Sequence, residues 1–456
     1  MKTKSGTKNK IILWGLVYWI ALSVSYIWPM QNDWSDTFPL EANILKFVLA
    51  SMTILAMLLL IPGNESILSL FFTIILYIVI FPVAIVYAFQ NRETCYYLSV
   101  VICFAFVEIA VRHIAPHKVS LRFMDHNPSK SIVIIGFIIL ILSLFVMYRE
   151  RGIPDMKSLD FSITYEIRAS YMLSSLASRL FRLVTRAVIP FMVSVYFLRK
   201  KYQNVIVLLF IQFVYFLWLA NKTTIFSIGI LVIGYYFAQA KNRTVLFSKI
   251  MSFGMIFISV LEGIRTQLNS GFGSVIANTY SLLVRRTMLV PAYLKFCYYD
   301  YFVIKENPLS GMFGTFAAPV LTRIGWYNPY KTITYTKTIG NYYASGSNAN
   351  TGIFGAELAH FGFLGIPIAG ILLLIFMLCV KRCESVNGGG FTCCLAIYTI
   401  VSLTDAGTIE LIGYSPMFLI ALIMYFSDLN EYKKEARSNK TRKDIQRKRI
   451  RIRYKV

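Results

Sequence analysis

Two residues that could handle a proton lie three positions apart, close to the start of an apolar segment. On a helix, Glu357 and His360 would be neighbours on adjacent turns. A carboxylate or an imidazole in such a place can orient a hydroxyl group or remove its proton. The same spacing is typical of a polar pair at a helix end that has no catalytic role. The sequence leaves both interpretations open.

Several arginines could bind an anionic group, because the guanidinium fork matches the oxygens of phosphates and carboxylates. Residues 149–182 hold six basic and four acidic residues, and residues 262–360 hold eight basic and four acidic residues. The chemistry favours a ligand such as a lipid diphosphate. The alternative is contact with the headgroups of ordinary phospholipids. The candidates are Arg168, Arg265, Arg285, Arg286 and Arg323.

Aromatic residues are concentrated in residues 326–343. The flat faces and polar edges of Trp and Tyr suit stacking on sugar rings, and they equally suit an aromatic belt at a membrane surface. The candidates for binding a sugar are Trp326, Tyr327 and Tyr330, and Tyr335, Tyr342 and Tyr343 follow them.

The composition indicates that these residues belong to a membrane protein. Hydrophobic residues make up 57% of the chain and charged residues 15%, whereas soluble domains carry about 25% charged residues. The mean hydropathy is +0.60. A net charge of +24 would suggest nucleic acid as the partner of a soluble protein. In a membrane protein it has a simpler cause, because Lys and Arg collect in cytoplasmic loops.

The sequence predicts chemistry without a cofactor. No metal-ligand spacing and no nucleotide-binding loop occurs in it, and the seven cysteines suit apolar filler in helices better than a metal site or a disulfide framework. We therefore expect no metal, no nucleotide and no nucleic-acid partner.

The elements that position these residues are membrane-spanning helices, each of which requires roughly 20 mostly apolar residues. About twelve such segments occur, and an even number with both termini in the cytoplasm agrees with the positive-inside rule. The short outer loops 31–43 and 404–411 contain no Lys or Arg. The predicted fold is all-α, a polytopic membrane protein with a large, partly helical outer loop. The approximate spans are 11–30, 44–61, 67–89, 95–114, 131–148, 183–198, 203–220, 223–240, 246–261, 361–380, 390–404 and 409–427.

This topology divides the chain into four parts. They are residues 1–261 with nine spans and the outer loop 149–182, the large outer loop 262–360, residues 361–430 with three spans, and the basic cytoplasmic tail 431–456. Positive charge is disfavoured in outer loops, so the arginines retained there indicate a ligand. The tail could bind acidic lipid or RNA, or it could only fix the topology.

Residues 276–302 mix apolar and basic positions. This pattern predicts an interfacial helix before Pro291. Such a helix would place Arg285 and Arg286 at the depth of lipid headgroups.

The segment that closes the large loop, SNANTGIFGAELAHFGFLG at Ser347–Gly365, resembles the end-of-loop motif of the Wzy-type polymerases of O-antigen and capsule repeat units. In that family a polar Asn/Thr stretch precedes a helix that ends in Phe-Gly-x-x-Gly. Residues 165–169, 182–190 and 221–224 also look like that family. The related O-antigen ligases usually carry a His-Asn pair where this chain has Asn350 and Thr351, and the difference favours a polymerase.

The resemblance implies a glycosyltransferase at the outer face of the bacterial cytoplasmic, or inner, membrane. Two undecaprenyl-diphosphate-linked oligosaccharides would meet there, and a hydroxyl group of one would displace the lipid diphosphate of the other. The arginines would hold the diphosphates, and Glu357 or His360 would activate the hydroxyl. The product would be O-antigen, capsule or exopolysaccharide, and a flippase and a chain-length regulator would be partners beside the bilayer. The rival functions are an O-antigen ligase-like transferase, a lipid-linked oligosaccharide flippase or transporter, and a non-enzymatic scaffold.

Overall fold

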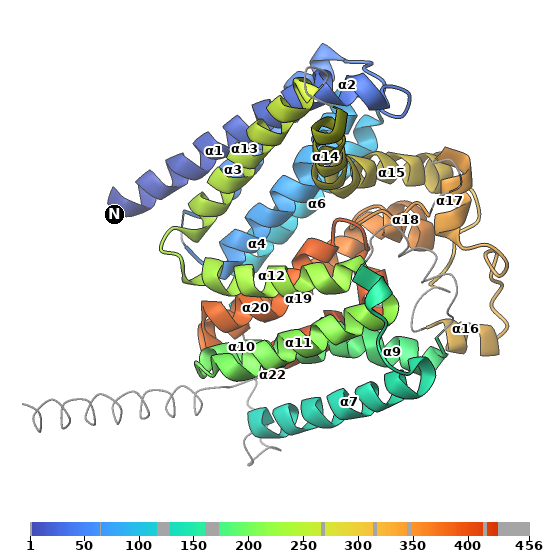
Figure 1. Ribbon diagram of the computed structural model, residues 1–456. Helices are drawn as coiled ribbons and strands as arrows, with labels where there is room; N and C mark the ends of the chain where they lie inside the picture. The colour runs from blue at the N-terminus through green and yellow to red at the C-terminus, as the bar shows by residue number, and fades with distance from the viewer. Residues whose placement is uncertain are drawn as a thin grey trace, which may run out of the picture. The chain divides into compact units, whose positions relative to one another are not determined.

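The computed structural model describes residues 2–63, 65–115, 128–159, 173–265, 270–312, 317–343, 346, 348–413 and 417–426. Within these residues the regular structure consists of helices and no strand, which confirms the all-α prediction for this part of the chain (Figure 1). Arg168 and the basic tail 431–456 lie outside the described residues.

Eight helices in the described part are long and apolar enough to cross a bilayer, so the chain is a membrane-embedded protein. They are Gly6–Trp34, Ile67–Phe89, Thr94–His113, Val133–Arg151, Ser175–Leu198, Tyr202–Leu219, Arg243–Gly263 and Ala356–Asn387. Three shorter apolar helices, Ile44–Leu60, Thr223–Gln239 and Gly389–Ser402, coincide with further predicted spans. The total of about twelve spans stays a prediction.

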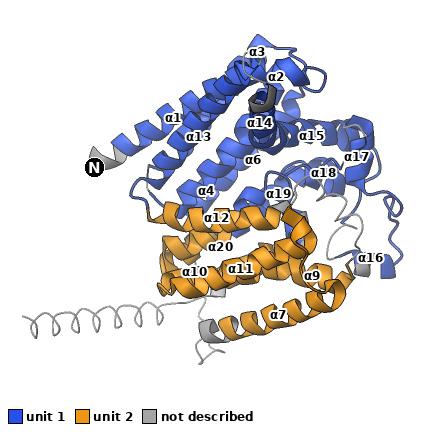
Figure 2. Cartoon of the chain, in the orientation of Figure 1, with its two compact units in different colours: residues 1–115, 240–378, 399–414 blue, residues 116–239, 379–398, 415–456 orange. Residues whose placement is uncertain are grey.

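The chain forms two compact units (Figure 2). Unit 1 comprises residues 1–115, 240–378 and 399–414, and it contains every described candidate residue. Its helices are α1 (Lys2–Ile27), α2 (Pro29–Trp34), α3 (Ile44–Leu60), α4 (Ile67–Ile75), α5 (Phe81–Phe89), α6 (Thr94–His113), α13 (Arg243–Gly263), α14 (Ser270–Tyr280), α15 (Val290–Tyr299), α16 (Ala318–Arg323), α17 (Tyr335–Tyr343), α18 (Ala356–Phe361), the first part of α19 (Gly365–Asn387) and α21 (Thr408–Gly413).

Unit 2 comprises residues 116–239, 379–398 and 415–456. Its described helices are α7 (Pro128–Arg151), α9 (Ser175–Leu183), α10 (Ile189–Leu198), α11 (Tyr202–Leu219), α12 (Lys222–Gln239), the end of α19, most of α20 (Gly389–Ser402) and α22 (Met417–Phe426). The side chain of Arg151 donates to the carbonyl of Trp218 at 2.6 Å, and the indole of Trp218 donates to the carbonyl of Gly152 at 2.9 Å. These bonds join the predicted outer segment 149–182 to the end of α11.

Three helices contain a π-helical segment directly before a proline. The segments are Leu76–Ile80 before Pro82, Val184–Val188 before Pro190 and Ser281–Leu289 before Pro291. A proline inside an α-helix removes one backbone donor, and its ring clashes with an earlier carbonyl. A wider π turn relieves that clash. The helix predicted before Pro291 therefore does not end there, because residues 270–304 are helical throughout.

Contacts within unit 1 bring the predicted outer segments together. Arg265 forms an ion pair with Asp33, and the guanidinium of Arg92 lies 5.1 Å from the ring centre of Tyr293. The backbone N–H of Ile353 donates to the carbonyl of Leu403 at 2.9 Å. These contacts join residues 31–43, the turn between α5 and α6, the 262–360 segment and Leu403, which directly precedes the predicted outer loop 404–411.

The turns that the topology assigns to the cytoplasm also meet within unit 1. The backbone N–H of Thr244 donates to the carboxylate of Glu65 at 3.3 Å, which joins the α3–α4 turn to the start of α13. Inside α6, Glu108 forms an ion pair with Arg112 one turn later.

Candidate active site

Two buried tyrosines hold the polar segment that precedes Glu357. The hydroxyl of Tyr298 on α15 donates to the carbonyl of Ala349 at 2.8 Å, and the hydroxyl of Tyr96 on α6 donates to the carbonyl of Phe354 at 3.0 Å. Both tyrosines are fully buried. Backbone groups without regular structure need such partners when they are buried. The segment 348–355 is therefore fixed by helices from distant parts of the sequence.

Glu357 is fully buried at the start of α18. Its Oε1 accepts hydrogen bonds from the hydroxyl of Thr408, at 2.7 Å, and from the backbone N–H of the same residue. Its Oε2 is also buried and has no hydrogen-bond partner in the described part of the chain. A buried carboxylate oxygen without a partner is costly. One oxygen thus holds the carboxylate in place, and the other has no hydrogen-bond partner among the described residues.

Two glycines let the backbone approach this carboxylate closely. A Cβ on Gly407 would lie 2.7 Å from Oε1 of Glu357 and 2.6 Å from the Cβ of Ala356, distances that side-chain atoms do not reach. A Cβ on Gly352 would overlap the carbonyl of Leu403. The glycine in the Asn-Thr-Gly part of the sequence motif therefore serves the contact with residues 403–408.

Lys295 on α15 belongs to the same group of residues, although we did not select it from the sequence. It is 1% exposed, and its ammonium lies 3.5 Å from the carbonyl of Pro291. The hydroxyl of Thr351 donates to the same carbonyl at 3.2 Å. Burial lowers the pKa of Lys295 to about 7, against the attraction of the carboxylates of Glu357 and Asp405. The signal in the sequence was a lone lysine in the middle of an apolar, aromatic run.

His360 is buried on α18 with partners of its own. Its Nδ1 lies 2.6 Å from the hydroxyl of Ser310 and accepts the backbone N–H of Met312 at 3.3 Å. Since Nδ1 is an acceptor, a neutral ring carries its proton on Nε2. Nε2 is buried with no hydrogen-bond partner among the described residues. His360 is therefore set up to donate a hydrogen bond through Nε2. We call Glu357, Thr408, Lys295 and His360 the buried cluster.

Arg265, just after α13, is held by two carboxylates. It forms ion pairs with Asp33, near the end of α2, and with Glu262, at 3.1 Å from Nε to Oε1. Glu262 is buried, whereas Arg265 and Asp33 are partly exposed. An anionic ligand at Arg265 would have to share the guanidinium with both acids. The assignment of Arg265 to a diphosphate stays a prediction.

Arg285 has uncharged partners. Its Nε donates to the hydroxyl of Ser281 at 3.0 Å, and its guanidinium lies 5.2 Å from the ring centre of Trp34. The indole of Trp34 stacks on the ring of Tyr280, with 5.6 Å between ring centres. Partial burial and the neighbouring Arg286 lower the pKa of Arg285. An anion bound here would relieve both effects.

These residues form a second group within unit 1. We call Arg265, Arg285, Arg286 and the Trp34 ring the arginine cluster. Arg285 and Lys295 are ten residues apart on one helix, which corresponds to about 15 Å along its axis. Arg286 and Arg323 are exposed. The arginine cluster and the buried cluster are thus close enough to contact different parts of one extended substrate.

The predicted sugar-binding residues have two different environments. Trp326 and Tyr327, in the turn after α16, are 59% and 77% exposed. The hydroxyl of Tyr330 donates to the carbonyl of Pro308 at 2.6 Å, and its ring packs edge-on against Tyr335. Tyr335 in turn contacts His360, with 5.2 Å between ring centres. Trp326 and Tyr327 present open faces for stacking, whereas Tyr330 supports the surroundings of His360.

A comparison with known proteins gave no matching family model, no similar curated protein and no similar solved structure. The assignment of function therefore rests on the chemistry of the chain's own residues.

Proposed function

We propose that the chain is a glycosyltransferase that polymerises lipid-diphosphate-linked oligosaccharide repeat units at the outer face of the bacterial cytoplasmic membrane. The observation that carries this proposal is the carboxylate of Glu357, which is buried with one oxygen held by Thr408 and the other without a hydrogen-bond partner in the described part of the chain. It lies in the motif that resembles the Wzy-type polymerases. The arginine cluster, whose Arg285 and Arg286 lie on the same helical run as Lys295, supports an anionic substrate.

The proposed reaction is a displacement at a sugar carbon. The oxygen of the acceptor hydroxyl attacks the anomeric carbon of the growing chain, and Glu357 takes the proton that this hydroxyl loses. The bond from that carbon to the diphosphate oxygen breaks, and the lipid diphosphate leaves with the bonding electrons. Arg285 and Arg286 stabilise the charge that develops on it. The Nε2–H of His360 donates a hydrogen bond to a sugar oxygen.

Lys295 has a supporting part in this proposal. A protonated amine near Glu357 favours the ionised carboxylate, which is the form that can accept a proton. The bond that breaks supplies the driving force, so the reaction consumes no nucleotide. Trp326 and Tyr327 would bind sugar units further along the chain by stacking.

The glycans of a deletion strain distinguish this function from its rivals. Loss of the polymerase leaves single repeats at the cell surface and removes the ladder of longer chains. Loss of a flippase removes surface glycan altogether, and loss of a ligase leaves polymer on its lipid carrier. If the protein were a non-enzymatic scaffold, substitutions in the arginine cluster would leave the length of the glycan chains unchanged. An unchanged ladder in the deletion strain would overturn the proposal.

A further inference from the structure

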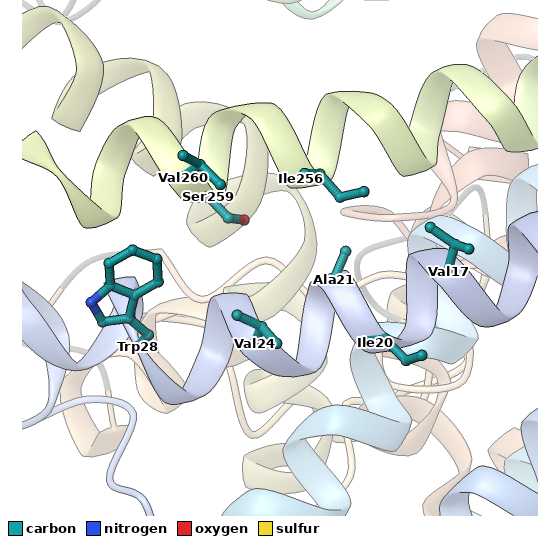
Figure 3. A pocket seen from close by; sticks show the side chains of 8 residues that line it. All are labelled: Val17, Ile20, Ala21, Val24, Trp28, Ile256, Ser259 and Val260. Atoms are coloured by element: carbon teal, nitrogen blue, oxygen red, sulfur yellow. The ribbon is translucent and has the colours of Figure 1, made fainter.

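An apolar groove runs between α1 and α13 in unit 1 (Figure 3). Its volume is about 320 Å³, at the lower end of the range for small-molecule sites. Its walls contain one polar side chain, that of Ser259. The lining residues are Val17, Ile20, Ala21, Val24, Trp28, Ile256, Ser259 and Val260.

The two helices run in the same direction, and small residues hold them together. The hydroxyl of Ser252 donates to the carbonyl of Trp14 at 2.8 Å near one end. Near the other end, a Cβ on Gly263 would overlap the ring of Trp28. Small residues allow such close helix packing in membranes. The groove lies between these two contacts.

The groove is open at its side. Ala21 and Ser259 are buried and form its floor, while Ile20 is 61% exposed and Val24 and Trp28 are also exposed. Both helices are long and apolar enough to span a bilayer. An open apolar groove at that depth adjoins lipid rather than water. Its natural occupant is a hydrocarbon chain, which packs against the walls by dispersion.

The length of the groove corresponds to one leaflet. Val17 and Trp28 are eleven residues apart on α1, which is about 16 Å at the rise of an α-helix. The hydrocarbon core of a bilayer is roughly 30 Å thick. Trp28 lies at the end of its span, where tryptophan commonly marks the headgroup level. A chain in the groove would therefore run from the headgroups beside Trp28 to about the middle of the membrane.

The headgroup end of the groove meets the arginine cluster. Glu262 follows the groove residue Val260 by two positions, and its partner Arg265 is also paired with Asp33 just beyond Trp28. The guanidinium of Arg285 lies over the ring of Trp34, and its Nε donates to the hydroxyl of Ser281. Neither of these partners is a carboxylate. An anionic headgroup at this end would meet cations that the nearby acids do not neutralise.

We propose that the α1–α13 groove holds the hydrocarbon chain of a single-chain lipid whose diphosphate headgroup is bound by Arg285 and Arg286. One groove between two helices accommodates one chain, which favours a polyprenyl diphosphate over a two-chain phospholipid. This inference rests on the proposed function, because the lipid would be the carrier of the glycan. It adds where in the fold the carrier lies.

Photo-crosslinking of the full-length protein in nanodiscs tests this site. A benzophenone amino acid replaces Ile20, in the groove, or Leu13, which is 57% exposed on the same face of α1, two turns before Ile20 and one turn beyond the groove residue Val17. The nanodiscs contain phosphatidylglycerol with either undecaprenyl diphosphate or undecaprenol, and mass spectrometry identifies the adducts. We expect a prenyl adduct at position 20 that is at least tenfold more abundant with the diphosphate than with undecaprenol, and none above background at position 13.

Two outcomes overturn the site. One is an adduct with phosphatidylglycerol alone at position 20, and the other is equal labelling by the diphosphate and the alcohol. The Arg285→Ala variant should lower the prenyl adduct at position 20 to the level seen with undecaprenol, and undiminished labelling would contradict the headgroup assignment. The proposed function is tested separately, by the ladder of glycan chain lengths in the deletion strain. Diphosphate-dependent labelling with an unchanged ladder in the deletion strain would retain the lipid site and remove the polymerase.

Discussion

The carboxylate of Glu357 accepts a hydrogen bond of 2.7 Å from the hydroxyl of Thr408, and both side chains are fully buried. The two residues are 51 positions apart in the chain. Their contact joins α18, at the end of the motif, to the first residue of α21. It fixes one oxygen of the carboxylate and leaves the other without a partner among the described residues, as we propose for a general base.

Glu357→Gln tests the proposed base. The amide keeps the size of the side chain and can still accept a hydrogen bond from Thr408, but it cannot take a proton. We expect polymer formation to fall by about 10² or more, while the purified protein keeps its melting temperature within a few degrees. The measurement is chain elongation of a lipid-linked repeat unit in nanodiscs. A variant with near-normal elongation would remove Glu357 from catalysis.

Thr408→Val tests how much the hydrogen bond from Thr408 to Glu357 contributes to the stability of the fold. It removes the hydroxyl donor and keeps the shape of the side chain, so that Oε1 of Glu357 retains only the backbone N–H. We expect a loss of about 1–3 kcal/mol of stability, seen as a lower denaturation midpoint in detergent. Thr408→Ser keeps the hydroxyl and should lose less than half as much. Equal losses in the two variants would show that the methyl group contributes as much as the hydrogen bond and would contradict this expectation.

Arg285→Ala should abolish the ladder of long chains, while the protein still inserts into the membrane. Arg285→Lys should also impair it, because lysine cannot present a bidentate fork to phosphate oxygens. Lys331→Ala, which removes an exposed cation of the same 262–360 segment, is the control and should leave the ladder intact. Full activity of the lysine variant would point to simple charge attraction. Normal chain length in Arg285→Ala would remove its assigned role.

Gly407→Ala tests the close approach to the carboxylate. Its Cβ would fall 2.7 Å from Oε1 of Glu357, so the carboxylate or the backbone must move. We expect about 1–3 kcal/mol of destabilisation together with loss of elongation. Gly254→Ala on α13 is the matched control, because a Cβ there meets no atom within 4 Å. That substitution should leave stability unchanged or raise it slightly. Similar effects at both glycines would contradict the packing argument.

Lys295→Met tests the buried amine through pH. Burial lowers the pKa of Lys295 to about 7 in the fold, whereas an unfolded lysine titrates near about 10.4. Between these values the unfolded chain binds more protons, so the stability of the wild type should rise with pH by at most about 1.4 kcal/mol per unit. The Lys295→Met variant lacks this contribution. Its melting temperature relative to wild type should fall steadily from pH 7 to pH 10, and a constant difference would show that Lys295 does not titrate in this range.

The sequence predicted the helices well, because their signal is local. Apolar segments of sufficient length and the breaks between them marked both ends of α13 and the end of α1 to within about three residues, whereas α1 begins nine residues before its predicted span. The prediction at Pro291 was wrong about where the helix ends. A proline usually stops an α-helix, but here a π-helical segment precedes it and residues 270–304 stay helical. Residue types do not reveal such a wider turn.

The sequence by itself determined that this is a helical membrane protein, and its motif pointed to Glu357 and His360. Those conclusions depend on hydrophobicity and spacing, which are properties of neighbouring residues. Only the tertiary structure decided that Lys295 and Thr408 share the surroundings of Glu357, and that Arg265 is already paired with Asp33. These partners come from helices and turns far apart in the chain. Their meeting depends on how the helices pack, and helix packing is set by many small contacts that no single stretch of sequence encodes.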